Sequence, residues 1–200
     1  LTEVIKNNKT GKKVLVFSYY SDTIKYLSER LPSIISTPNF GQKSAFVSGD
    51  TKGQIEDIVG RFAPVAKNKV VEEADEIDYL FATDVLSEGQ NLQDCGTLIN
   101  FDLHWNPVRM IQRNGRINRL GSDYENVFVY NMSPETNLEQ YLKLVNRLEK
   151  KIEVISKTIG TDTAILGGDE NPLEYIDDIE EQAKGNTVVL NLYDKDKAND

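Results

Sequence analysis

Five short segments rich in β-branched and aromatic residues recur along the first two thirds of the chain. They are residues 13–18, 45–48, 78–83, 97–101 and 126–130. Most are nearly continuous apolar runs rather than alternations of apolar and polar positions. Such runs are typical of strands that are buried on both faces of a parallel sheet. The pattern therefore predicts five strands in a largely parallel sheet.

Helical patterns lie between these segments. Ser21 or Asp22 can cap a helix that continues to Leu31, and Pro32 is expected to end it. Residues 54–62 carry apolar side chains at helical spacing. A third helix is expected to begin at the cap and first-turn pair Asn106-Pro107 and to continue through Arg119, where Gly121 can end it.

The alternation of strands and helices predicts an α/β fold, a doubly wound and mainly parallel sheet flanked by helices. A long helix with one apolar stripe is expected over residues 133–159. Beyond Gly160 the pattern weakens: residues 173–183 suit a short acidic helix, and residues 195–200 are expected to be frayed. The chain is thus divided into a lobe, residues 1–160, and an acidic C-terminal extension, residues 161–200.

The charge of the chain is unevenly distributed. The formal net charge is −9, and residues 161–200 contain 11 acidic and 3 basic residues, a balance of −8. The remaining 160 residues are close to neutral, so a basic face for nucleic acid is compatible with the composition. The single cysteine, Cys95, excludes an internal disulfide and fits a reducing cytosol. A cytoplasmic location is therefore expected. No apolar stretch approaches the ~18 residues of a membrane span, so no membrane contact is expected.

The run Gln-Arg-Asn-Gly-Arg-Ile-Asn-Arg over residues 112–119 concentrates three arginines in a chain that is acidic as a whole. On a continuous helix Gln112, Arg116 and Arg119 share one face. Gly115 lies mid-helix in this interpretation, where it costs ~1 kcal/mol relative to alanine, and it indicates a close approach to the backbone. Guanidinium groups suit phosphate oxygens. The alternative is a solvated basic face of a helix.

This run resembles the sixth signature motif of superfamily 2 helicases and translocases, Gln/His-Arg-x-Gly-Arg-x-x-Arg. The resemblance implies that Arg116 and Arg119 are arginine fingers toward ATP, and that Gln112 lies near the γ-phosphate. It also implies that Arg113 and Gly115 lie at the interface with ATP and a partner lobe.

Further segments of this sequence resemble other motifs of the superfamily, and they occur in the order that is expected for it. Residues 82–92 resemble motif V, which implies a nucleic-acid phosphate contact for Thr83 and positions near the ribose and the lobe interface for Gly89 and Asn91. The first strand, ending at Ser18, resembles motif IV, which implies a nucleic-acid contact for Ser18. Residues 48–52 resemble a segment that binds a DNA backbone, with Thr51 and Lys52 as phosphate contacts; the order Gly49-Asp50 is reversed relative to the family.

Residues 101–107 and 89–92 resemble the corresponding segments of Swi/Snf-like ATPases. The Ser-Glu-Gly-x-Asn run over residues 87–91 resembles bacterial RNA-polymerase-recycling ATPases in particular. This resemblance implies a RecA-like lobe that contacts nucleic acid, with double-stranded DNA as the favoured ligand, and a role in a transcription or DNA-repair complex. His104 is interpreted as an exposed turn residue. No metal site is expected in this chain.

The sequence contains no Gly-x-x-x-x-Gly-Lys-Ser/Thr loop and no Walker B box. We therefore expect the chain to be the second lobe of a larger ATPase, with ATP and Mg²⁺ held mainly by an N-terminal RecA-like lobe, and to be inactive by itself. The alternative is a degenerate lobe that binds nucleic acid or protein without catalysis. A free-standing Rossmann-type enzyme is a weaker hypothesis, since no Gly-x-Gly-x-x-Gly follows the first strand.

Overall fold

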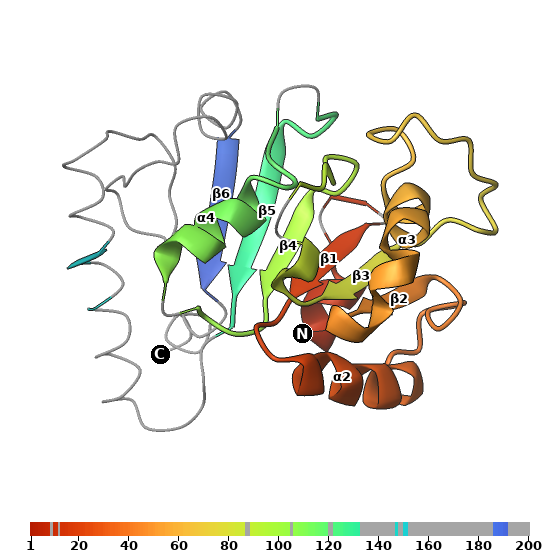
Figure 1. Cartoon of the computed structure of the whole chain (residues 1–200), viewed down its shortest axis with the longest axis horizontal. Helices are drawn as coiled ribbons and strands as arrows, with labels where there is room; N and C mark the ends of the chain where they lie inside the picture. The colour runs from red at the N-terminus through yellow and green to blue at the C-terminus, as the bar shows by residue number, and fades with distance from the viewer. Residues whose placement is uncertain are drawn as a thin grey trace.

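The computed structural model describes residues 1–8, 10–11, 13–86, 89–104, 106–119, 122–132, 147, 150–151 and 186–191, with only the backbone of residues 50, 52 and 186–191. The strands are β1 (Val14–Phe17), β2 (Ser44–Val47), β3 (Tyr79–Ala82), β4 (Thr97–Asn100), β5 (Asn126–Asn131) and β6 (Asn186–Asn191). They form one sheet in the order β2-β3-β1-β4-β5-β6, and every neighbouring pair is parallel (Figure 1). The predicted parallel α/β fold is confirmed.

The five predicted strands are all present, and each agrees with the prediction to within one residue at either end. The edge strand β6 was not predicted. It pairs with β5 along its whole length, from Asn126 opposite Asn186 to Asn131 opposite Asn191. A segment of the predicted acidic extension therefore takes part in the sheet.

Helices cover both faces of the sheet. They are α1 (Thr2–Lys6), α2 (Ser21–Ile34), α3 (Ile55–Phe62) and α4 (Pro107–Asn114), with short 3₁₀ turns η1 (Gly49–Gln54) and η2 (Asp84–Leu86). Successive side chains of a strand point to opposite faces. Leu15 and Phe17 of β1 accordingly pack with α3, whereas Val14 and Val16 pack with α1 and α2. In Figure 1, α4 lies in front of β5 and β6, and α2 lies below the sheet.

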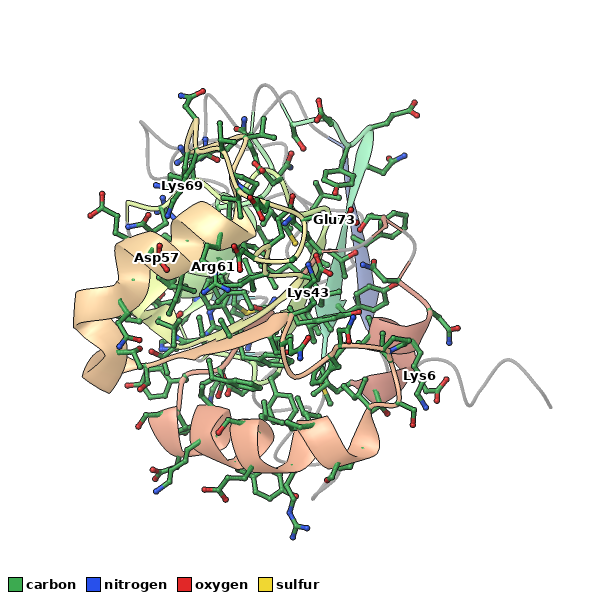
Figure 2. The ribbon with its side chains drawn as sticks, turned by 90° about the vertical axis from the view of Figure 1, so that its right-hand side faces the viewer. Lys6, Lys43, Asp57, Arg61, Lys69 and Glu73 are labelled. Atoms are coloured by element: carbon green, nitrogen blue, oxygen red, sulfur yellow. The ribbon has the colours of Figure 1, made fainter. Side chains whose placement is uncertain are left out.

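Charged side chains tie α3 to the segment that follows it. The Lys69 ammonium donates to Asp57 at 2.8 Å, and Arg61 lies 3.9 Å from the same carboxylate. The Arg61 Nε donates to the carbonyl of Asp75 at 2.8 Å. Figure 2 shows Asp57, Arg61 and Lys69 together on the outer side of α3. These exposed contacts anchor a long surface connection between α3 and β3.

Two predicted helix ends are wrong. Helix α2 continues past Pro32 to Ile34, because a proline in the last turn removes a single hydrogen bond and the amide of Ile35 still donates to Leu31 at 2.9 Å. Helix α4 ends at Asn114 instead of Arg119. Its cap, Asn106, is confirmed, since the Asn106 side chain accepts a hydrogen bond from the amide of Val108 at 3.2 Å.

The chain beyond α4 forms tighter turns. Gly115 is the cap of α4 and not a mid-helix residue. The amides of Arg116 and Ile117 donate to carbonyls three residues back, at 3.1 and 3.2 Å. These bonds interrupt the four-residue repeat of the α-helix, although the amide of Asn118 donates to the carbonyl of Asn114, four residues back, at 3.0 Å. Gln112, Arg116 and Arg119 therefore do not share one helix face; residues 115–119, here called the arginine turn, form a separate element.

The predicted helix over residues 133–159 lies outside the described residues except for residues 147 and 150–151, which are helical. The predictions for residues 173–183 and 195–200 lie wholly outside them. Among the helices that the structure describes, none is long and apolar enough to cross a membrane.

Candidate functional site

The carboxyl ends of parallel strands meet at one edge of the sheet, where open α/β folds place their ligands. Ser18 follows β1, Thr83 follows β3, and Thr51 lies in η1 just beyond β2. Because these three strands are neighbours, the three residues lie in a row along this edge. Lys52 is also in η1, but its side chain lies outside the described residues. The structure thus brings together the positions that were expected to contact nucleic acid.

The hydroxyl of Ser18 is buried and forms its hydrogen bonds within the lobe. Ser18 is fully buried, and its Oγ donates to Asp102 at 2.5 Å. The amide of Tyr19 donates to both oxygens of the same carboxylate, at 2.8 and 3.1 Å. The Asp102 carboxylate therefore holds the backbone in place where β1 ends. Hydrogen bonds from Ser18 and Tyr19 compensate its negative charge.

Thr51 and Thr83 also shape the edge. The Thr51 hydroxyl donates to the carbonyl of Ser48 and accepts from the amide of Ser48, both at 2.9 Å. Thr83 is 9% exposed, and its carbonyl accepts from the amide of Leu86 at 3.2 Å, which starts η2. Each threonine closes the turn that follows its strand, and Thr51 remains partly exposed.

Arg113 is the centre of a buried polar network beneath this edge. Its side chain is 0% exposed, and its Nε and Nη2 donate to the two oxygens of Asp84 at 2.7 and 3.1 Å. Its Nη1 donates to Asn100 Oδ1 at 3.2 Å and to the carbonyl of Asp102 at 3.4 Å. The guanidinium also lies 5.3 Å from the centre of the Phe17 ring. Arg113 therefore joins the ends of β1, β3 and β4.

The arginine turn packs against the loop that resembles motif V. The carbonyl of Arg116 accepts a hydrogen bond from the amide of Leu92 at 2.9 Å. Arg116 itself is buried, with 5% exposure, whereas Arg119 is partly exposed and its Nε donates to the carbonyl of Gly115 at 3.0 Å. The two segments that were expected at a lobe interface are thus neighbours, although the two arginines differ in accessibility.

The loop before Leu92 has a backbone that requires glycine. Gly89 is exposed and has φ +71°, a left-handed conformation that L-residues with a side chain rarely adopt. Asn91 is partly buried, and its Oδ1 accepts from the amide of Gln93 at 3.2 Å. Both residues therefore act on the shape of the loop that meets the arginine turn.

Polar atoms of two amide side chains near the end of α4 are buried without a hydrogen-bond partner in the described part of the chain. The Oε1 of Gln112 and both polar atoms of the Asn114 side chain have no hydrogen-bond partner in the part of the chain that the structure describes. Asn114 is 1% exposed. An unpaired buried amide is destabilising. Sequence reasoning did not find this feature, because burial at the end of α4 depends on tertiary packing.

The interpretation of His104 as an exposed turn residue is wrong. His104 is 5% exposed, and its Nδ1 accepts from the amide of Asn106 at 2.9 Å. Its ring packs edge-on against Tyr19, with ring centres 4.8 Å apart. Burial lowers the pKa of His104 below its usual range. Within the described residues, no group of three or more His, Cys, Asp or Glu side chains is placed to hold a metal ion.

The structure also reveals two exposed aromatic rings at the carboxyl edge. Tyr19 and Tyr20 directly follow Ser18 and are 49% and 60% exposed. The sequence offered a signal, since two consecutive tyrosines after a buried strand are placed at the edge where ligands bind.

Comparison with known proteins assigns the family. Residues 1–121 match the helicase conserved C-terminal domain. The chain belongs to this family. The matched residues include β1 to β4, the loop around Gly89 and the arginine turn. The broad resemblance to superfamily 2 helicases is thereby confirmed.

Two relatives and one solved structure illustrate the relationship. The uncharacterized ATP-dependent helicase YqhH of Bacillus subtilis (strain 168) is 43% identical over 84 residues, 42% of this chain and 14% of that protein. Dicer-like protein 1 of Aspergillus fumigatus is 29% identical over 185 residues, 91% of this chain and 11% of that protein. The chain therefore spans about a seventh or less of these relatives. The C-terminal part of the Fun30 ATPase domain is similar in fold, with a TM-score of 0.56 and 20% identity over 74% of this chain and 43% of that chain.

Proposed function

We propose that this chain is the second RecA-like lobe of an ATP-dependent nucleic-acid translocase. ATP and Mg²⁺ would be held mainly by a first lobe, and Gln112, Arg116 and Arg119 would complete the site from this lobe. The observation that carries the proposal is the hydrogen bond from the Leu92 amide to the Arg116 carbonyl, 2.9 Å long. It joins the two segments whose motifs meet ATP in the family, and so supports a common surface for both.

Closure of the two lobes would have to change the environment of the arginines. Arg119 is partly exposed and would exchange the Gly115 carbonyl for a phosphate oxygen, which is a stronger, charge-assisted partner. Arg116, which is 5% exposed, would become accessible only when the arginine turn moves. Arginine fingers accelerate phosphoryl transfer by roughly 10³ to 10⁵ in other nucleotidases, because they neutralise charge on the transferred group.

The carboxyl edge would contact the backbone of the nucleic acid through Ser18, Thr51, Lys52 and Thr83. The hydroxyls of Ser18 and Thr51 are occupied internally in this structure, so their main effect would be to hold the edge in shape for amide and lysine contacts. The nearby carboxylates of Asp84 and Asp102 are already paired within the lobe, which reduces their repulsion of phosphate. Contacts of this kind position a strand without reading its bases.

The finer identity of the parent protein belongs to the same proposal. The motifs that resemble Swi/Snf-like ATPases, and bacterial RNA-polymerase-recycling ATPases among them, favour movement along double-stranded DNA in a transcription or repair complex. Such movement would need repeated closure of the two lobes on ATP.

The burial of Arg116 favours a second candidate function. A lobe whose finger residue is 5% exposed can serve as a non-catalytic module that binds nucleic acid or protein. In that case hydrolysis by any assembly that contains this chain would not depend on Arg116 or Arg119.

The proposal is tested by measuring ATP hydrolysis with and without a first lobe. The 200-residue chain alone is expected to show no Mg²⁺-dependent turnover. Joined to a first lobe that carries a Walker A loop, it is expected to raise the turnover of that lobe, and added nucleic acid is expected to raise it further. Turnover by the clean chain alone, or a first lobe that is equally active without this chain, would contradict the proposal.

A further inference from the structure

The carboxyl edge carries an aromatic surface beside the row of polar residues. Tyr19 and Tyr20 leave β1, which lies between β3 and β4 in the sheet. Their rings are 49% and 60% exposed and meet edge to face, with centres 5.1 Å apart and planes at 86°. A single exposed aromatic residue is ordinary, whereas two in contact at a ligand-binding edge need an explanation.

The backbones of both residues and the ring of Tyr19 are held in place by the lobe, and the ring of Tyr20 packs against that of Tyr19. The backbone of Tyr19 is fixed by two hydrogen bonds to the Asp102 carboxylate, and its ring packs against buried His104. The amide of Tyr20 donates to Ser18 Oγ at 3.2 Å, and Tyr20 precedes the first turn of α2. A ring that is exposed yet fixed loses little conformational freedom when a flat ligand binds to it.

Another exposed tyrosine shows what sets this pair apart. Tyr26 lies in the second turn of α2 and is 57% exposed, but the Arg30 guanidinium of the same helix lies 5.8 Å from its ring centre. Tyr26 thus has a local partner on its own helix. Tyr19 and Tyr20 instead lie next to Ser18, in the row proposed to follow a phosphate backbone.

We propose that Tyr19 and Tyr20 form a stacking platform for an unpaired base, so that the carboxyl edge binds single-stranded nucleic acid in preference to duplex. The inference rests on the proposed function, because it assumes that the backbone of the strand passes along this edge. Bases of a duplex are stacked on each other and do not present a free face, whereas each base of a single strand does. The aromatic pair therefore favours nucleic acid with unpaired bases as the ligand of this edge. The motif resemblance, in contrast, favours a duplex.

The test compares three fluorescent ligands of equal length by anisotropy at low salt: a thymidine 20-mer, an abasic 20-mer and a 20-base-pair duplex. The chain is expected to bind the thymidine strand more tightly than the other two. Tyr20→Ala is expected to weaken thymidine binding by about fivefold or more, the effect of losing one stacked base. Abasic binding should not change, and Tyr20→Phe, which keeps the ring, should restore the affinity.

Tyr26→Ala is the matched control, because it removes an exposed ring from α2, the helix that begins directly after Tyr20, and it should leave all three affinities unchanged. Tyr19→Ala and Tyr19→Phe repeat the test on the second ring, and circular dichroism checks that each variant is folded. Equal affinity for thymidine and abasic strands, unaffected by Tyr20→Ala, would overturn the stacking platform and leave the backbone contact standing. Absence of binding to every ligand would overturn both the stacking platform and the proposed nucleic-acid contact. The proposed role of the arginine turn at the ATP site is tested separately, by ATP hydrolysis.

Discussion

The end of helix α4 and the arginine turn share the eight-residue run 112–119, yet they use their arginines in different ways. Arg113, on α4, is 0% exposed and donates hydrogen bonds to Asp84, Asn100 and Asp102. Arg119, on the turn, is partly exposed and donates to a carbonyl of its own turn. The same residue type thus fixes the architecture at one position and remains accessible at another.

The different roles of Arg113 and Arg119 follow from the interactions that each guanidinium would lose if its side chain moved. A buried ion pair is costly to break, because the remaining charge has no water to replace its partner. A partly exposed arginine exchanges one polar partner for another or for water at little cost. We therefore expect Arg113 to determine stability and Arg119 to determine catalysis in the assembled protein.

The largest expected effect on stability is that of Asp84→Ala. It leaves the Arg113 guanidinium buried without its main partner, and loss of one member of a buried pair costs about 3–5 kcal/mol. Urea denaturation of the chain measures this change in the free energy of unfolding. Asp57→Ala is the control, because Asp57 pairs with Lys69 and Arg61 on the exposed side of α3 (Figure 2). Equal losses in the two variants would remove the distinction between buried and exposed pairs.

A smaller change, of opposite sign, is expected for Asn114→Leu. The Asn114 amide is buried and unpaired at the junction of α4 and the arginine turn, and removing an unsatisfied polar group of this kind is expected to stabilise the chain by about 1 kcal/mol. Asn100→Leu is the matched control: Asn100 is equally buried, but its Nδ2 donates to Asn131 at 2.9 Å and its Oδ1 accepts from Arg113. Denaturation midpoints should move apart, upward for Asn114→Leu and downward for Asn100→Leu. A downward shift in both would show that Asn114 has a partner after all.

The smallest effect is a dependence of stability on pH through His104. Burial lowers the pKa of His104, so the unfolded chain takes up this proton more readily than the folded chain. The contribution of His104 to stability is therefore complete above about pH 6.5, the usual pKa of histidine, and decreases as the pH falls below it. His104→Gln should flatten the fall in unfolding free energy between pH 7.5 and 5.5. An unchanged slope would show that His104 is not responsible.

The strands could be predicted from sequence because each is a short apolar run bounded by polar residues, a local property. The end of α4 could not, since arginine, isoleucine and asparagine suit both a helix and a turn, and the bonds of Arg116 and Ile117 three residues back decide the outcome. Strand β6 was missed because its few apolar residues stand in an acidic segment, and its strand character depends on pairing with β5.

In the candidate site, too, some features could be predicted from the sequence and others depend on tertiary packing. The position of Ser18 and Thr83 at the carboxyl edge could be predicted, because each directly follows a strand of a parallel sheet. Their neighbourhood with Thr51 depends on the strand order, which the sequence pattern did not predict. The burial of Arg113 could not be predicted from the sequence. A charged residue is buried only where partners such as Asp84 and Asn100 converge on it from other strands. The exposure of Tyr19 and Tyr20 likewise depends on which elements cover the edge.

The most direct test of the account is ATP hydrolysis by an assembly of this chain with a first lobe, after substitution in the arginine turn. Arg119→Ala and Arg116→Ala are each expected to reduce turnover by roughly a hundredfold or more, the effect of losing a group that neutralises phosphoryl charge. The unfolding midpoint of Arg119→Ala should stay near that of the unsubstituted protein, in contrast to Asp84→Ala. Near-normal turnover in both arginine variants would contradict the assignment of this turn to the ATP site.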